Sequence, residues 1–404
     1  MQGGRPRAIC VVTGSELVRG ERTDLNGPYL AREALRLGLE PIRISIVGDD
    51  PLELEAALRE ALGAADAVFV SGGLGPTHDD RTVEVVAKAL GLSTHVDPEL
   101  EREIEAVSRA AAERSGRDYA EFARGARKQA TKPDGALSIG LAGTAPGLLV
   151  AREGAPIVVV LPGPPTELQR LWPNALTTEP FHRLLARTHP PGRRVFRLFG
   201  VTESAVAGAL ADAGGDGDGV EVTICARDYE IHVDLVVELG AEARADELER
   251  GFIGPLGSYV YGRDERTVEE HVIALCRTRG LTIGTAEIGT AGLVATRLLA
   301  VEGAPGVAVG GIATGSDELA RRRLGVSNAS AATLAGAART ELGVDVALGV
   351  SGLAAPGGGA TRLHLHAVGP DGERSREFVF SGQPAAIRPR AAVVALHLVR
   401  ALLA

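Results

Sequence analysis

The sequence has few of the residues that characterise secreted or disulfide-stabilised proteins. Its 404 residues include only three cysteines, Cys10, Cys225 and Cys276, whose scattered positions predict neither a disulfide framework nor a zinc site. No signal peptide precedes the first apolar segment, and no apolar run reaches the length of a membrane span. Aromatic residues make up 3% of the chain, so its core has to be aliphatic. We therefore expect a cytoplasmic protein with no membrane partner.

Lysine is also scarce. Of the 43 basic side chains only three are lysines, Lys88, Lys128 and Lys132, and none follows residue 132. The formal net charge is −9, which argues against a general nucleic-acid-binding protein. We expect no direct nucleic-acid partner, and any chemistry in the last two thirds of the chain has to work without lysine.

What the sequence does contain is a series of short apolar segments that alternate with helical patterns. In the first 175 residues this alternation is typical of a doubly wound α/β domain with a parallel sheet. From about residue 190, period-two strands around a short helix indicate a small α+β unit. From about residue 264 strands and helices alternate again. We expect three domains, with residues 1–175, 176–262 and 263–404.

A glycine-rich segment follows one buried strand of the first domain. The residues SGGLGPTHDD (71–80) connect that strand to a predicted helix at 81–92, where backbone N–H groups and the helix dipole favour anions. Gly72, Gly73 and Gly75 would let a phosphate approach the backbone closely. We expect Asp79 and Asp80 in the first helical turn, where helix capping is the structural alternative to metal binding.

Further polar residues follow the neighbouring strands. Asp49 ends the second strand, and Glu16, Asp24 and Asn26 come after the first. The carboxyl ends of parallel strands share one edge of a sheet, where α/β proteins bind ligands. Several carboxylates there beside a glycine-rich loop indicate a site for a hard metal ion and a diphosphate.

Six segments of the chain resemble, in order and spacing, those of the CinA family (competence/damage-inducible protein A). They are TGSELVRGERTDLN (13–26), VGDD (47–50), SGGLGPTHDDRT (71–82), KQA (128–130), GTAPG (143–147) and LPGPPTE (161–167). The resemblance spans nearly the whole chain. It implies a molybdopterin-binding-like N-terminal domain of the MogA/MoaB fold, a small KH-like connector and an α/β C-terminal amidohydrolase-like domain, often assembled as a homodimer.

For the first domain the resemblance implies an ADP-ribose pyrophosphatase, a hydrolase that depends on a divalent metal such as Mg, Mn or Co. By position, the residues that would hold the diphosphate are Gly72, Gly73, Gly75 and Thr77. The residues that would bind the metal and act in catalysis are Asp49, Asp79 and Asp80, and those that would complete the substrate pocket are Glu16, Asp24 and Asn26. Two positions depart from the family pattern: Ala126 replaces the usual Asn, and Leu25 replaces Thr.

For the last domain the resemblance implies a nicotinamide mononucleotide deamidase whose nucleophile is a serine in A-E-S-C-T-G-G. This chain has TAEIGTAG (285–292), with Ile288 at the serine position. Gly315 and Ala320 take the positions of the family's tyrosine and lysine. Amide hydrolysis through a hydroxyl needs a nucleophile and a base, and isoleucine supplies neither. We predict that this domain is an inactive, degenerate deamidase.

Several alternatives stay open at this point. Glu287 is either a buried helix-capping group or a base. His364 and His366, which alternate on a strand, are either metal ligands or solvated residues. The glycine-rich turn SGLAAPGGG (351–359) either binds a nucleotide or only preserves the fold. The alternative to an enzyme is a non-catalytic nucleotide-binding or assembly protein in competence or the DNA-damage response. Molybdenum-cofactor binding would rest on fold analogy alone.

Overall fold

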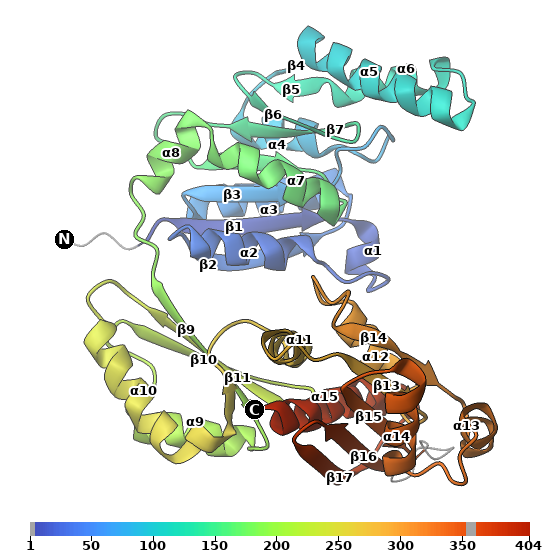
Figure 1. The fold of residues 1–404 in the computed structure, drawn as a ribbon. Coiled ribbons are helices and arrows are strands. Elements are labelled where there is room, and N and C mark those ends of the chain that lie inside the picture. Colours follow the sequence, from blue (N-terminus) through green and yellow to red (C-terminus); the bar gives the residue numbers. More distant parts are fainter. Residues whose placement is uncertain (1–4, 353–360) are drawn as a thin grey trace. The chain divides into compact units, whose positions relative to one another are not determined.

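The computed structural model describes residues 5–352 and 361–404 (Figure 1). The chain divides into two units, residues 1–191 and 192–404. The second unit contains two separate sheets, and the division into three domains stays a prediction. Among the helices in the described ranges, none is long and apolar enough to cross a membrane.

The first unit is built on a six-stranded sheet in the order β2-β1-β3-β8-β7-β6. Four neighbouring strands, from β2 to β8, run parallel, and β7 and β6 continue the sheet as an antiparallel pair. The strands are β1 (Arg7–Thr13), β2 (Glu40–Val47), β3 (Ala67–Ser71), β6 (Leu137–Ala142), β7 (Ala145–Val150) and β8 (Ile157–Leu161). A separate pair consists of β4 (Thr94–Val96) and β5 (Thr131–Pro133).

Helices cover both faces of this sheet, which confirms the doubly wound α/β prediction (Figure 1). Alternate residues of β1 enter two different cores: Ile9 and Val11 pack on one face, and Ala8 and Cys10 on the other. The helices on the first face are α3 (Pro51–Ala64), α4 (Thr82–Leu90), α5 (Pro98–Ser115) and α6 (Ala120–Gln129). Those on the second are α2 (Asn26–Arg36), α7 (Pro165–Leu176) and α8 (Glu179–Leu185). Burial on both faces explains why these strands are continuous apolar runs.

The second unit begins with a four-stranded antiparallel sheet in the order β10-β11-β9-β12. Two helices pack on it around the edge-to-face pair Phe196 and Phe252, which gives the predicted small α+β arrangement. The elements are β9 (Gly192–Phe199), α9 (Glu203–Asp212), β10 (Val220–Arg227), β11 (Glu230–Val237), α10 (Glu242–Leu256), the 3-10 turn η1 (Gly257–Tyr259) and β12 (Val260–Gly262).

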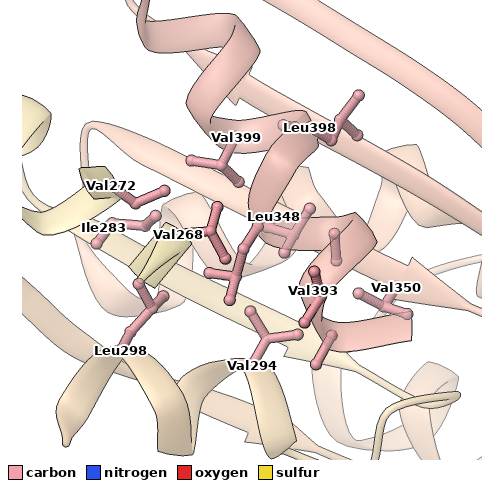
Figure 2. Packing of buried hydrophobic residues seen from close by; sticks show 14 of the residues in the cluster. Val268, Val272, Ile283, Val294, Leu298, Leu348, Val350, Val393, Leu398 and Val399 are labelled. Carbon is pink, nitrogen blue, oxygen red and sulfur yellow. The ribbon is translucent and has the colours of Figure 1, made fainter. Parts of the chain in front are cut away.

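A five-stranded sheet in the order β14-β13-β15-β16-β17 forms the rest of this unit. The first three strands are parallel and the last two antiparallel. Aliphatic side chains from β13, β15 and three helices fill its main core, including Val268, Leu348 and Val399 (Figure 2). The elements are α11 (Val268–Thr278), β13 (Ile283–Glu287), α12 (Leu293–Leu299), β14 (Ala308–Ala313), α13 (Asp317–Leu324), α14 (Ala331–Leu342), β15 (Val346–Ser351), β16 (Thr361–Gly369), β17 (Gly372–Phe380) and α15 (Pro384–Leu403).

A buried polar cluster joins the two sheets of the second unit. Glu230 on β11 accepts hydrogen bonds from the Tyr261 hydroxyl and from His397 Nε2 on α15, each at 2.7 Å. Phe199 stacks on the His397 ring with centroids 3.8 Å apart. Burial alone would raise the pKa of Glu230, but the hydrogen bonds from its neighbours outweigh it and lower that pKa to about 2. A buried carboxylate without hydrogen-bond donors would be costly. Glu230 therefore stabilises the contact between the four-stranded sheet and α15, because His397 supplies one of its donors.

Candidate active site

The glycine loop between β3 and α4 has a backbone that only glycine can adopt without strain. Gly72 and Gly73 have φ values of 104° and 63°. A Cβ at Gly72 would lie 2.4 Å from the Thr13 carbonyl oxygen, and one at Gly73 would lie 2.2 Å from Thr82 Oγ1. Both the positive φ and the close contacts exclude larger residues. The packing of the loop itself therefore requires glycine at both positions, and their role in binding a phosphate stays a prediction.

Asp79 and Asp80 close this loop together with Thr77. Asp80 Oδ2 accepts from the Thr77 backbone N–H at 2.9 Å and from Thr77 Oγ1 at 2.6 Å, and Thr77 Oγ1 also contacts Asp79 Oδ1. The Thr77 hydrogen bond is the main cause that lowers the pKa of Asp79. The expectation that both carboxylates occupy the first helical turn is wrong, because α4 begins at Thr82. They stabilise the loop before the helix, and a Cβ at Gly75 would lie 2.4 Å from Asp80 Oδ2.

Asp49 connects the end of β2 to the turn after β1. Its carboxylate accepts from the backbone N–H of Ser15 at 2.9 Å, from Ser15 Oγ at 2.6 Å and from Thr13 Oγ1 at 3.2 Å. Across residues 5–352 and 361–404, no three His, Cys, Asp or Glu side chains gather in a group that could hold a metal ion. Asp49 is thus not brought into one such group with Asp79 and Asp80, and the metal site stays a prediction.

Glu16, Asp24 and Asn26 line one cavity of 460 Å³, as their shared strand edge predicts. Asp24 accepts the backbone N–H of Asn26 at 2.8 Å and so stabilises the start of α2. The Asn26 amide donates to Ser71 Oγ at 2.9 Å and to the Gly163 carbonyl at 2.7 Å. These two bonds fix its orientation and leave Asn26 Oδ1 buried without a protein partner. Asn26 thus contributes a buried acceptor without a partner beside the cavity.

The two departures from the family pattern have different surroundings. Leu25 lines the same cavity, and 60% of it is exposed. Ala126 is buried in the core between α6 and the sheet. Neither substitution removes a carboxylate or a glycine of the loop.

The deamidase positions of the second unit are filled by apolar packing. Ile288 is only 2% exposed and Ala320 is fully buried, and both belong to one hydrophobic cluster. At Gly289, where the family has cysteine, a Cβ would lie 2.3 Å from Leu363 Cδ2. Gly315 is exposed and has open space around it. The structure therefore gathers no hydroxyl nucleophile and no amine base at these positions.

Glu287 caps α12, which resolves one of the open alternatives. Its carboxylate accepts from the Thr285 and Thr290 hydroxyls, both at 2.7 Å, and from the backbone N–H groups of Val294 and Ala295 at 3.1 and 2.8 Å. It is 1% exposed. The Thr290 hydroxyl has a carboxylate beside it, which the sequence did not reveal, but both groups are buried. The Glu287 carboxylate accepts four hydrogen bonds that stabilise the turn before α12. It is therefore a structural group and not a free base.

His364 and His366 lie on β16, and among the described residues they belong to no group that could hold a metal ion. His364 is half exposed and lies 3.4 Å from Glu377 Oε2, whereas His366 is buried and its Nδ1 lies 2.7 Å from Ser375 Oγ. Of the two alternatives, the solvated one therefore applies to His364, whereas it is wrong for His366, which is buried. The predicted glycine-rich turn at 351–359 falls largely outside the described residues.

Sequence reasoning missed several polar residues of the first unit. Thr13 and Ser15 bind Asp49, and Ser71 orients Asn26. Lys128 and Gln129 contact the glycine loop from α6. The sequence held one signal for the last two, because KQA (128–130) belongs to the resembling segments.

Comparisons with known proteins cover both units. Residues 9–181 match a family described as probable molybdopterin binding domain, and residues 265–403 match the CinA C-terminal domain. Proteins named CinA-like protein from Mycolicibacterium gilvum and Mycobacterium marinum are each 37% identical to this chain, over 98% of both sequences. The relative from Mycobacterium tuberculosis is 36% identical over 98% of this chain and 96% of its own.

Two solved structures align with parts of the chain. A crystal structure of CinA from Thermoplasma acidophilum is 32% identical and covers 43% of this chain and 97% of its own, with a TM-score of 0.38. That of the tungsten cofactor synthesizing protein MoaB from Pyrococcus furiosus is 23% identical and covers 46% of this chain and 99% of its own, with a TM-score of 0.30.

Proposed function

Because the chain belongs to the family of CinA-like proteins, we propose that its first unit is a metal-dependent hydrolase that splits the diphosphate of ADP-ribose or a related nucleotide. The observation that supports this proposal most directly is the loop from Gly72 to Asp80. This loop contains three glycines and two adjacent carboxylates. We propose further that the second unit has no deamidase activity, and that the protein is a homodimer.

In this proposal the diphosphate binds at the glycine loop. The N-terminal end of α4, which follows the loop, would favour the anion, whereas the Gly72 N–H already donates to the Leu161 carbonyl oxygen. The cavity lined by Asn26 adjoins the loop, because a Cβ at Gly163 would lie 3.6 Å from Gly72 Cα. Glu16, which is partly exposed in this cavity, would accept hydrogen bonds from the sugar hydroxyls, and Asn26 Oδ1 would do so if its side chain turned toward the ligand. The phosphates and the sugar of one nucleotide would thus occupy neighbouring parts of one site.

The carboxylates beside the loop fit a divalent cation. Thr77 Oγ1 contacts oxygens of both Asp79 and Asp80, yet a hydroxyl has only one hydrogen to donate. With both carboxylates ionised, one of these contacts brings unshared electron pairs together, and a nearby cation would relieve the repulsion. Mg²⁺ is commonly bound by one or two carboxylates together with substrate phosphates. When bound, such an ion would neutralise diphosphate charge and activate a water molecule.

The roles of the carboxylates differ in this proposal. Asp79 and Asp80 would hold the ion. Asp49, the third predicted ligand, accepts three hydrogen bonds from Ser15 and Thr13, and we assign it to positioning the edge of the site.

The decisive experiment measures AMP release. Purified protein would be incubated with ADP-ribose and Mg²⁺, Mn²⁺ or Co²⁺ in turn, beside a double Asp79→Ala, Asp80→Ala variant. We expect AMP and ribose 5-phosphate from the wild type and a loss of at least 100-fold in the variant, as for other groups that act directly in catalysis. The same preparations would be given nicotinamide mononucleotide, from which we expect no ammonia.

A non-catalytic nucleotide-binding protein is the second candidate, and one observation favours it. No three-residue metal-binding group exists among the described residues. Binding of ADP-ribose without AMP release, with any of the three metals, would establish this second candidate and exclude the first.

A further inference from the structure

Helix α6 contacts the glycine loop through three residues. Gln129 Nε2 donates to the Leu74 carbonyl oxygen at 2.9 Å, and Gln129 is buried. A Cβ at Gly125 would lie 2.6 Å from Pro76 Cβ, so the helix and the loop are in close contact there. The Lys128 ammonium group donates to the Thr77 carbonyl oxygen. Consecutive residues Lys128 and Gln129 thus bind two carbonyls of the loop proposed to hold the diphosphate.

Lys128 differs from the other two lysines of the chain in its partner. Lys88 pairs with Glu55 and Lys132 with Asp97. Within the described part of the chain, Lys128 has no carboxylate partner within ion-pair distance, and its ammonium group rests on a neutral carbonyl. The bond to the Thr77 carbonyl has a charged donor only, whereas a bond to a phosphate oxygen would join a cation and an anion. An anionic ligand nearby would therefore compete well for this ammonium group.

The space between α6 and the loop is too small for a ligand as it stands. The cavity there measures 40 Å³ and is lined by Gly73, Gly75, Asp80, Glu84 and Lys128, among others. Small-molecule sites usually measure about 300–1,000 Å³. Asp79 and Asp80 make this region negative, so a diphosphate needs positive charge on its other side. Lys128 lines this cavity and contacts Thr77, and its movement would both enlarge the space and supply that charge.

We propose that Lys128 is a phosphate-binding residue of this site, and that its ammonium group leaves the Thr77 carbonyl to contact the diphosphate. The inference rests on the proposed function, because it assumes that the loop binds phosphate. Gln129 keeps its bond to Leu74 in both arrangements and holds the loop in place. Lys128 is thus a direct ligand contact and Gln129 a positioning residue.

The test compares binding of inorganic pyrophosphate and of ADP-ribose, each with Mg²⁺, by titration calorimetry at several salt concentrations. Lys128→Gln removes the charge but keeps an N–H donor for the Thr77 carbonyl, and Lys128→Arg keeps the charge. Lys88→Gln is the matched control for loss of one lysine charge on the same unit. We expect Lys128→Gln to weaken both ligands about tenfold or more and to reduce the salt dependence of binding. Lys128→Arg should restore most of the affinity, and Lys88→Gln should change it less than twofold.

The outcomes separate this inference from the proposed function. Equal affinity of the wild type and Lys128→Gln for pyrophosphate would overturn the inference, even if AMP is released. Weaker binding by Lys128→Gln alone, without AMP release by the wild type, would support the inference and refute the hydrolase. A wild type that binds neither ligand would overturn both. Thermal melting of each variant measures any loss of fold, and we expect melting temperatures within about 2 °C of the wild type.

Discussion

Placing a serine at position 288, the predicted nucleophile position, should destabilise the second unit without creating an enzyme. Ile288 is 2% exposed and packs in a cluster that also contains Ala320 and Leu334. Ile288→Ser replaces an aliphatic side chain there with a hydroxyl. The neighbours that would have to activate this hydroxyl are absent, because Ala320 and Gly315 carry no base.

The expected cost follows from burial. The substitution removes about three apolar carbon groups at about 0.8 kcal/mol each. The cavity left behind and the unpaired buried hydroxyl add to this, which gives a total of about 3–5 kcal/mol. For a unit of this size, roughly 2–4 °C of melting temperature is lost per kcal/mol. We therefore expect the transition of the second unit to fall by roughly 6–20 °C.

The assay is calorimetric melting of the full chain together with ammonia release from nicotinamide mononucleotide. Ile44→Ser is the matched control, because Ile44 is 40% exposed and lies in the first unit. It should lower the free energy of unfolding by about 1 kcal/mol or less. Ammonia release by Ile288→Ser, or a loss of stability no larger than that of the control, would refute the reasoning.

Three further predictions follow from the geometry. Gly73→Ala should abolish AMP release, because its Cβ would lie 2.2 Å from Thr82 Oγ1 at a φ of 63°, and nucleotide titration would detect the lost binding. Asp24→Ala removes the acceptor for the first amide of α2 and should cost about 1 kcal/mol in chemical denaturation. In acid, the second unit should lose stability in two steps, measured as melting temperature against pH. Burial lowers the pKa of His397 from its ordinary 6.5, so its contribution is complete above pH 6.5 and declines as the pH falls below that value. The pKa of Glu230 is lowered from 4.5 to about 2, so its contribution declines between those values, and Glu230→Gln should remove this second step.

Much of the first unit could be predicted because parallel strands impose a common edge. The alternation of apolar and helical segments predicts the sheet, and the sheet places Glu16, Asp24 and Asn26 in one cavity. The glycine loop was predictable because Gly72 and Gly73 adopt backbone conformations that other residues avoid. The position at which α4 begins could not be predicted. Hydrogen bonds from Thr77 hold Asp80 in a turn, and the helix therefore begins only at Thr82.

Contacts between distant segments could not be predicted from the sequence. Asn26 and Gly163 are 137 positions apart in the chain, yet their hydrogen bond leaves Asn26 Oδ1 without a partner. The Lys128 contact with Thr77 likewise depends on how α6 docks against the loop. No local pattern encodes either distance, since each depends on the packing of whole elements.

The residues at the predicted deamidase positions of the second unit fit one another. A single change of serine to isoleucine in an otherwise intact site would leave an apolar side chain among polar groups. Ile288 instead contributes to a cluster with the buried Ala320, and Glu287 has four hydrogen-bond donors around it. Gly289 also leaves no space for the family's cysteine beside Leu363. Because packing, capping and backbone spacing agree with one another, the region is a consistent structural core, and creating a deamidase site there would require several coordinated changes in place of one.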